Sequence, residues 1–295
     1  MNYLINGIRG FCMALADSVP GVSGGTIAFI LGFYDNFINS LDDLAFGNFE
    51  KKKKALFFLI KLGIGWVIGM ILAVLILTNL FESHIYVVSS LFIGFIVFSI
   101  PLIIKEEKLN LKGKYGNLVF TLIGIVVVVL ITYFNPMSSE ANLVDISSLN
   151  IGLAIYVFIS ASIAISAMVL PGISGSTLLL ILGLYIPIIT AIKEILHFNL
   201  KYFPVLLIFG LGIIFGILLV IKLIKLALKK YRSQSIYCIL GLMIGSIYAI
   251  IMGPTTLSES VMPLSLSTFS VLAFIISGII IIVLEKVRII LEKRK

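Results

Sequence analysis

Charged residues are scarce in this sequence. Only 12% of the 295 residues are charged, whereas 60% are hydrophobic and the mean hydropathy is +1.19. A soluble domain needs a solvated polar shell, so this composition excludes one. Several apolar runs have the roughly 20 residues that a helix needs to cross a hydrocarbon core of about 30 Å. The sequence therefore predicts an all-α polytopic membrane protein.

Cysteine and histidine are also rare, with two of each. Cys12 and Cys238 fall inside apolar stretches, so no disulfide framework is expected. His84 and His197 stand in predicted loops, and two isolated histidines do not make a metal site. The sequence contains no glycine-rich phosphate loop and no Ser-His-Asp set or carboxylate pair. We therefore expect no catalytic residues, no metal and no cofactor.

The net charge of +8 could suggest nucleic acid, but the basic residues are confined to short segments between apolar runs. In a membrane protein this pattern indicates orientation, so no nucleic-acid partner is expected. Four basic segments carry 18 of the 22 Lys and Arg residues: 51–54, 105–114, 222–232 and 286–295.

One motif occurs twice. Residues 20–34 (PGVSGGTIAFILGFY) and 171–185 (PGISGSTLLLILGLY) are identical at nine of fifteen positions, at a constant offset of 151. Downstream, a glycine triplet at 63, 65 and 69 is echoed at 210, 212 and 216. An ordered series of matches indicates a duplicated unit.

Each half has the same predicted plan, a broken apolar segment followed by three continuous spans. In the first half, residues 1–134, the broken segment is 3–41 and the spans are about 56–80, 86–104 and 116–134. A polar linker, 135–150, precedes the second half, residues 151–295. There the broken segment is 151–196 and the spans are about 202–220, 236–252 and 269–284.

The charges predict how these segments cross the membrane. If each broken segment enters and leaves on one side, all four basic segments face the cytoplasm, and only Lys193 and Lys201 lie in an outer loop. If each crossed once, the basic segment 222–232 and the C-terminus would face outward. We therefore expect two re-entrant hairpins in two inverted-topology repeats. Both termini would be cytoplasmic, in a multi-pass protein of the cytoplasmic membrane.

The Pro-Gly-x-Ser-Gly-x-Thr motif predicts a helix break at membrane depth. Proline stops a helix, glycine permits unusual dihedral angles, and Ser or Thr caps the helix that restarts. The restarted helix offers free N–H groups and about half a positive charge, which suits phosphate or another anion. Because a break in lipid must line a cavity, we expect both breaks to meet near the midplane as one site.

Two ionisable residues, Arg9 and Asp17, stand inside the first broken segment, where charges are rare and usually functional. Arg9 could hold a phosphate as a fork donor, and because only one half has the charged pair, the pair could serve coupling to protons or sodium. Alternatively the two neutralise each other, although eight residues separate them. The predicted substrate-binding residues are Arg9, Asp17, Ser18, Gly21, Ser23, Gly24, Gly25, Thr26, Gly172, Ser174, Gly175, Ser176 and Thr177.

Other glycines have a simpler interpretation. Small residues let helices approach closely in membranes, and a proline, a serine and a threonine are not needed for that. We therefore assign the following glycines to packing alone: Gly63, Gly65, Gly69, Gly94, Gly210, Gly212, Gly216 and Gly241.

The segment 13–26 (MALADSVPGVSGGT), with the repeated motif and the Ile-Leu-Gly-x-Tyr that follows it, resembles a known family. These are the bacterial and archaeal polyprenyl-phosphate transporters, long filed as a domain of unknown function, and the likeness covers essentially the whole chain. The resemblance implies a carrier that returns undecaprenyl phosphate from the outer to the cytoplasmic leaflet for cell-wall and surface-polymer synthesis.

The residues themselves leave two other functions open. A small-anion channel or an ion-coupled anion transporter could use the same converging helix N-termini, without an opening for lipid. An intramembrane lipid phosphatase would need a nucleophile and an acid-base partner, for which Ser23 and Asp17 are the candidates.

Overall fold

The regular structure is entirely helical in the described part of the chain. The computed structural model describes residues 2–17, 23–72, 78–134, 144–146, 149–196, 198–256 and 261–293. Within them, six helical stretches are long and apolar enough to cross a membrane, and one bent helix pair would make a seventh. The prediction of an all-helical polytopic membrane protein is thus confirmed.

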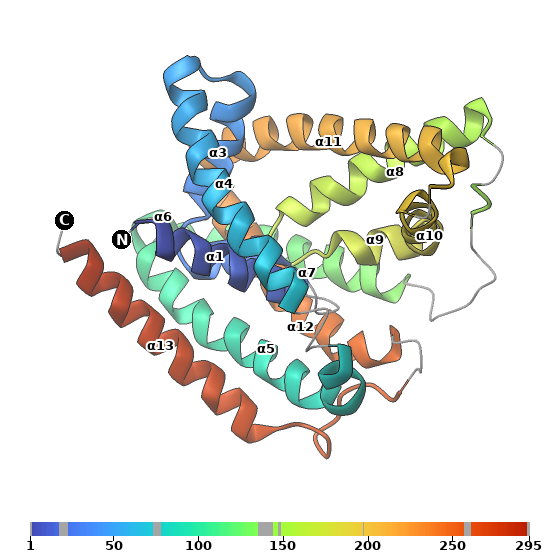
Figure 1. The fold of residues 1–295 in the computed structure, drawn as a ribbon. Coiled ribbons are helices and arrows are strands. Elements are labelled where there is room, and N and C mark those ends of the chain that lie inside the picture. Colours follow the sequence, from blue (N-terminus) through green and yellow to red (C-terminus); the bar gives the residue numbers. More distant parts are fainter. Residues whose placement is uncertain are drawn as a thin grey trace.

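The described residues of the first half form seven α-helices and one 3₁₀ turn in chain order (Figure 1). They are α1 (Asn2–Asp17), α2 (Gly24–Ile30), α3 (Tyr34–Phe46), α4 (Phe49–Leu72), α5 (Thr78–Glu106), α6 (Lys108–Leu111), η2 (Tyr115–Asn117) and α7 (Leu118–Tyr133). Helix α4 begins earlier than the predicted span, so the basic residues 51–54 form its first turns.

The second half repeats the order of the long helices. Its elements are α8 (Ile151–Val169), α9 (Gly175–Ile181), α10 (Tyr185–Leu196), η4 (Leu200–Tyr202), α11 (Phe203–Lys230), α12 (Arg232–Met252), η5 (Gly253–Thr256) and α13 (Val271–Lys293). Helix α8 is itself long and apolar enough to cross a membrane, although the sequence suggested only the entering arm of a hairpin.

Each broken segment contains a second turn that was not predicted. After the break a helix of seven residues, α2 or α9, ends at a glycine with positive φ, Gly32 at 67° or Gly183 at 65°. The N–H of Phe33 then bonds the carbonyl of Ala28, as a left-handed glycine cap allows. In the second half, α9 and α10 meet at 106°. The Ile-Leu-Gly-x-Tyr sequence is therefore a turn, and the return arm is a separate helix.

Glycine contacts repeat between the halves. A methyl group on Gly65 of α4 would overlap the carbonyl of Gly7 in α1, and one on Gly212 of α11 would overlap that of Phe158 in α8. Gly7 and Phe158 are 151 residues apart, which is the offset of the motif. The packing role predicted for these glycines is confirmed, because helices this close leave no room for a side chain.

The same offset holds one turn further along. Gly69 faces Phe11, and Gly216 faces Ser162. For Gly63 and Gly210, however, the packing prediction was wrong. A methyl group on either would meet nothing within 4 Å among the described atoms, since both glycines face away from the neighbouring helix.

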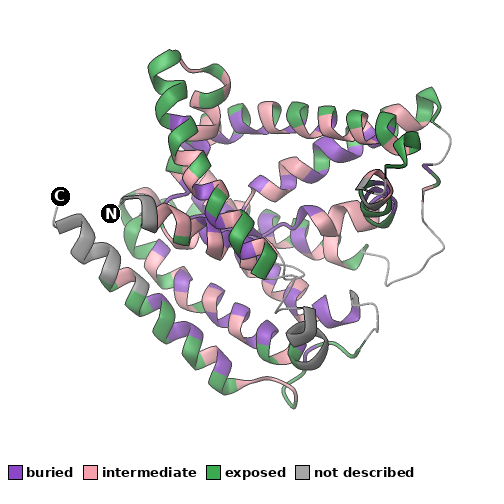
Figure 2. Cartoon of the chain, viewed as in Figure 1, coloured by how far each residue is buried: buried purple, intermediate pink, exposed green. Residues whose placement is uncertain are grey.

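The halves exchange helices. Helix α5 of the first half packs on α13 of the second, and α7 packs on α12. Gly94 lies against Ser277 in the first pair, and Gly241 lies against Thr121 in the second. Helix α12 is central. Of its most apolar stretch 67% is buried inside the molecule, whereas only 11% is buried in the stretch that contains α7 (Figure 2). Two long helices of each half thus form one interlocked bundle.

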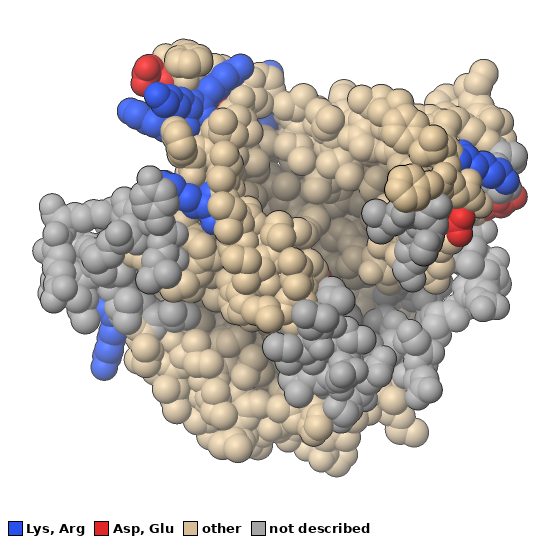
Figure 3. Space-filling view, viewed as in Figure 1, with Lys and Arg blue, Asp and Glu red and all other residues tan. Residues whose placement is uncertain are grey.

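The basic segments lie toward one side of the molecule. Figure 1 places the start of α4, the end of α11, α6 and the ends of α1 and α13 that carry the N and C marks on the left. Most Lys and Arg atoms visible in Figure 3 lie there too. The start of α8 and the end of α7 lie on the opposite side. Helices α1 and α8 therefore approach the centre from opposite sides.

Candidate functional site

The two helix breaks meet in the interior. Ser23 of the first break donates from Oγ to the carbonyl of Leu170, at 3.2 Å. The N–H of Gly172 in the second break donates to Thr26 Oγ1, at 2.7 Å. Both Ser23 and Thr26 are 1% exposed. The prediction that the breaks come together is confirmed, and hydrogen bonds between their backbone and hydroxyl groups join them.

Glycine makes this approach possible. A methyl group on Gly25 would lie 2.8 Å from the carbonyl oxygen of Val169, closer than side chains and backbone tolerate. Gly172 has φ of +88°, a conformation that L side chains rarely adopt, and it packs on Leu242 of α12. The duplicated glycines thus serve backbone contact between the breaks and with α12.

At the first break, a carboxyl group of the same half caps the helix that follows. Asp17 Oδ1 accepts from the N–H of Gly24, at 2.6 Å, at the start of α2. Its Oδ2 accepts from Trp66 Nε1 of α4, at 2.9 Å. Ser23 also caps α2, since its Oγ accepts from the N–H of Thr26 at 3.3 Å. A carboxyl group of the protein therefore already occupies the N-terminus of α2.

The second break is built differently. Ser174 precedes α9 but makes no capping bond with its side chain, and its Oγ instead pairs with Ser176 Oγ, at 2.8 Å. Met168 stands where the first half has Asp17, so no carboxylate reaches the start of α9 from that position. Ser176 and Thr177 are only partly buried. The start of α9 thus retains hydroxyl groups but carries no carboxylate cap.

Arg9 lies on α1 away from the break. Its Nη1 donates to Asn6 Oδ1 at 3.2 Å, and its guanidinium carbon lies 4.8 Å from the centroid of the Phe33 ring. Eight helical residues separate Arg9 from Asp17, or about 12 Å of rise. Asp17 directs its two side-chain oxygens to Gly24 and Trp66.

Two contributors were not predicted. Trp66 is the single tryptophan of the chain. An indole N–H in an apolar span needs an acceptor, so the sequence did contain an indication that Trp66 bonds a polar group. Tyr34 donates from its hydroxyl to the carbonyl of Val169, at 3.1 Å, and so binds the return arm of one break to the other. Its recurrence as Tyr185 was the signal in that case. Ser18 and Gly21 lie outside the described residues.

Ser23 and Asp17 have separate partners. Ser23 bonds Thr26 and Leu170, whereas Asp17 bonds Gly24 and Trp66, and no hydrogen bond among the described residues joins the two side chains. A hydrolytic serine needs a base within hydrogen-bond reach. The arrangement therefore does not favour a phosphatase.

The family comparison agrees with the resemblance. Residues 13–267 match the model of the VCA0040-like family, described as undecaprenyl phosphate translocase-like. The chain belongs to this family. It is also 33% identical, over 258 residues, to a protein of Vibrio cholerae named polyprenyl-phosphate transporter, covering 84% of this chain and 77% of that protein.

A second protein with the same name, from Staphylococcus aureus, is 33% identical over 257 residues, which is 85% of this chain and 87% of that protein. No solved structure matches. The matched segment of the translocase-like family contains Asp17, Trp66 and both breaks, whereas Arg9 lies before it.

Proposed function

We propose that this chain carries polyprenyl phosphate, such as undecaprenyl phosphate, across the cytoplasmic membrane from the outer to the cytoplasmic leaflet. Two breaks that meet in the interior, approached by α1 and α8 from opposite sides, are the observation on which the proposal rests. The family description and the names of both relatives supply the lipid class. The phosphate would bind at the breaks while the prenyl tail remains in the bilayer.

We propose that the phosphate binds at the second break before it binds at the first. The N-terminus of α9 lacks the carboxylate that Asp17 supplies to α2, and Ser174, Ser176 and Thr177 add hydroxyl donors. At the first break the phosphate would have to displace Asp17 from Gly24. The other predicted substrate-binding residues of the first half, Arg9 included, remain part of this proposed site.

Asp17 is the residue that we propose for coupling. Protonation of Asp17 would weaken its bond with Gly24 and free the N-terminus of α2 for a phosphate. Such a site binds proton and lipid together. A sodium ion is the alternative, since a carboxylate could serve either cation.

We further propose two inverted repeats with both termini in the cytoplasm. The basic segments toward one side of the molecule support this orientation. Cysteine labelling in intact cells, at Ser139 and Ser258 of the predicted outer segments, tests it. We expect both positions to react with a membrane-impermeant reagent, and protection of either would refute the arrangement.

Transport itself is tested by the flux of labelled polyprenyl phosphate in proteoliposomes, with and without a proton or sodium gradient. The proposal predicts flux above that of protein-free liposomes and stimulation by one gradient. Flux equal to the protein-free background would refute it. Chloride conductance without lipid flux would establish the channel alternative, and released inorganic phosphate would establish an enzyme.

A further inference from the structure

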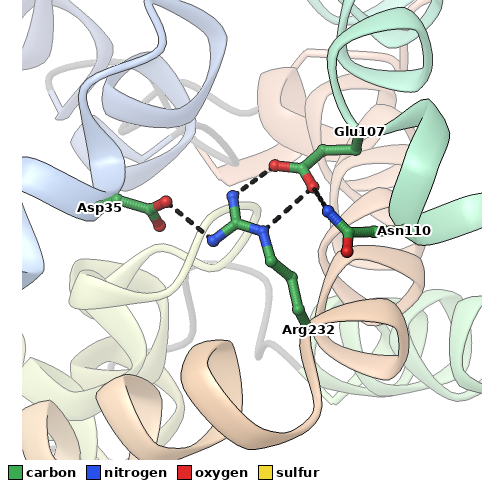
Figure 4. A network of polar contacts seen from close by, with 4 residues as sticks. All are labelled: Asp35, Glu107, Asn110 and Arg232. Carbon is green, nitrogen blue, oxygen red and sulfur yellow. Dashed lines mark hydrogen bonds and ion pairs between the residues drawn. The ribbon is translucent and has the colours of Figure 1, made fainter.

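A cluster of charged side chains joins the two halves at the basic side. Arg232, the first residue of α12, donates from Nη1 to Asp35 Oδ2 at 2.9 Å and from Nε to Glu107 Oε2 at 3.1 Å, and Nη2 bonds Glu107 Oε1 (Figure 4). Asn110 Nδ2 donates to Glu107 Oε2 at 2.7 Å. One arginine of the second half thus holds two carboxylates of the first.

Helix α3 is tied to the second half at two further points. Lys225 of α11 pairs with Asp42, and Lys222 Nζ lies 4.0 Å from the centroid of the Phe46 ring. Asp35 and Asp42 are seven residues apart, so they lie on one face of α3. We name Asp35, Asp42, Glu107, Lys225 and Arg232 the inter-half cluster.

The cluster is partly sheltered from solvent. The side chains of Glu107 and Asp42 are 14% and 16% exposed, whereas those of Arg232, Lys225 and Asp35 are 34%, 38% and 45% exposed. Fork geometry and partial burial make such ion pairs stronger than single pairs on an open surface. The cluster can therefore bias the position of α3 against α11 and α12.

Helix α3 also connects the cluster to the breaks. Tyr34 and Asp35 are adjacent at its start, and the Tyr34 hydroxyl bonds Val169 at the second break. A movement of α3 away from α11 and α12 would therefore break the bond of Asp35 with Arg232 and pull on the contact between the two breaks.

Among the described residues, the other half does not make the corresponding contact to the same extent. Applying the offsets of 151 and 147, the equivalents of α3 and α11 are α10 and α4. Helix α3 packs on α11, whereas among the described residues the main contacts of α10 are with α9, α11 and η4, all in its own half. Figure 3 shows a hollow at this place, between α4 and α10.

The cluster chemistry is missing there as well. The equivalents of Asp35 and Arg232 are Ile186 and Ile85, and the equivalent of Glu107 is Pro254. A duplicated structure that is closed by ion pairs at one side and parted at the other has the asymmetry of a transporter in one of its two states.

We propose that the inter-half cluster is the cytoplasmic gate, and that α3 must leave α11 and α12 for the phosphate to reach the cytoplasmic leaflet. This inference rests on the proposed function. In the opposite state α10 would approach α4 and close the hollow. Because the cluster bonds are lost in that state, they bias the protein toward the outward-open arrangement.

Distances between spin labels test the gate without any lipid. With Cys12 and Cys238 replaced by alanine, one label pair is placed at Asn39 of α3 and Lys229 of α11, and another at Ile71 of α4 and Thr190 of α10. All four positions are exposed. We expect a short distance for the first pair and a long one for the second.

The variant Arg232→Gln should lower the ratio of closed to open populations at the first pair by about tenfold, and shorten the second distance in the same fraction of molecules. Glu50→Gln, which removes an exposed charge at the same side outside the cluster, is the matched control and should change neither. The exchanged pair Asp42→Lys with Lys225→Asp should keep the distances of the parent protein. Unchanged distances in Arg232→Gln would overturn the gate.

A reversible cross-link controls for loss of function by misfolding. Asp42→Cys and Lys225→Cys, bridged by a short cleavable thiol reagent, should stop lipid flux, and cleavage should restore it. Undiminished flux in the bridged protein would overturn the gate. Because the distances need no substrate, a protein that moves as expected but carries no lipid would refute the proposed function alone.

Discussion

The first and second breaks share one motif, yet they differ in the side chains that cap the helix following the break. At the first, Asp17 and Ser23 cap α2, and Trp66 holds the carboxylate in place. At the second, Met168 replaces the carboxylate and the Ser174 side chain does not cap α9. The two breaks thus share one motif, and single side chains decide whether the helix that follows each break is capped by a carboxylate.

Giving the second break a carboxylate should have the largest effect. In Met168→Asp the new carboxylate lies where Asp17 lies in the first half, and it would compete with phosphate for the start of α9 and repel it. We expect affinity for polyprenyl phosphate in nanodiscs to fall on the order of tenfold to a hundredfold. Met168→Asn is the matched neutral control, and an equal loss in both variants would assign the effect to shape.

Removing the indole N–H that donates to Asp17 should have the second largest effect. Trp66→Phe keeps an aromatic ring but leaves Oδ2 without its indole N–H. A hydrogen bond to a charged group contributes about 1.5–3 kcal/mol, so the free energy of unfolding should fall by that amount. The same substitution in an Asp17→Asn background should cost clearly less. Equal costs in both backgrounds, measured by reversible unfolding in detergent, would show that the bond contributes nothing.

The smallest difference concerns the two serines. Ser23→Ala removes a helix cap and the bond to Leu170, which should lower stability by about 1–2 kcal/mol. Ser174→Ala removes no cap and should lower stability by less than about 0.5 kcal/mol. Melting temperatures without lipid compare them. A greater loss for Ser174→Ala would reverse our assignment of the capped and uncapped breaks.

Much of this architecture was predictable because it is local or repeated. A proline directly followed by glycines stops a helix, so the motif predicted where α1 and α8 end. The repeated glycines predicted close helix packing, although not the partners, which the structure shows to be α1 with α4 and α8 with α11. Inversion of the repeats remains a prediction.

The remainder depended on tertiary approach. The bond between Asp17 and Trp66 joins residues 49 apart, and no periodicity indicates it. Arg232 and Lys225 were interpreted only as orientation charges, because their partners lie in the other half. Gly63 and Gly210 share the spacing of packed glycines but face away from the neighbouring helix. The spacing of glycines along a helix does not distinguish these two from the glycines that pack.

The central claim is that both breaks form one phosphate site, and a double-mutant cycle on polyprenyl-phosphate affinity tests it most directly. Ser23→Ala, Ser174→Ala and the double variant are compared in nanodiscs, with melting temperatures measured in the absence of lipid. A single site predicts that each substitution weakens binding and that the two losses fail to add, with a coupling of at least about 0.5 kcal/mol. Strictly additive losses would separate the two breaks and contradict the account.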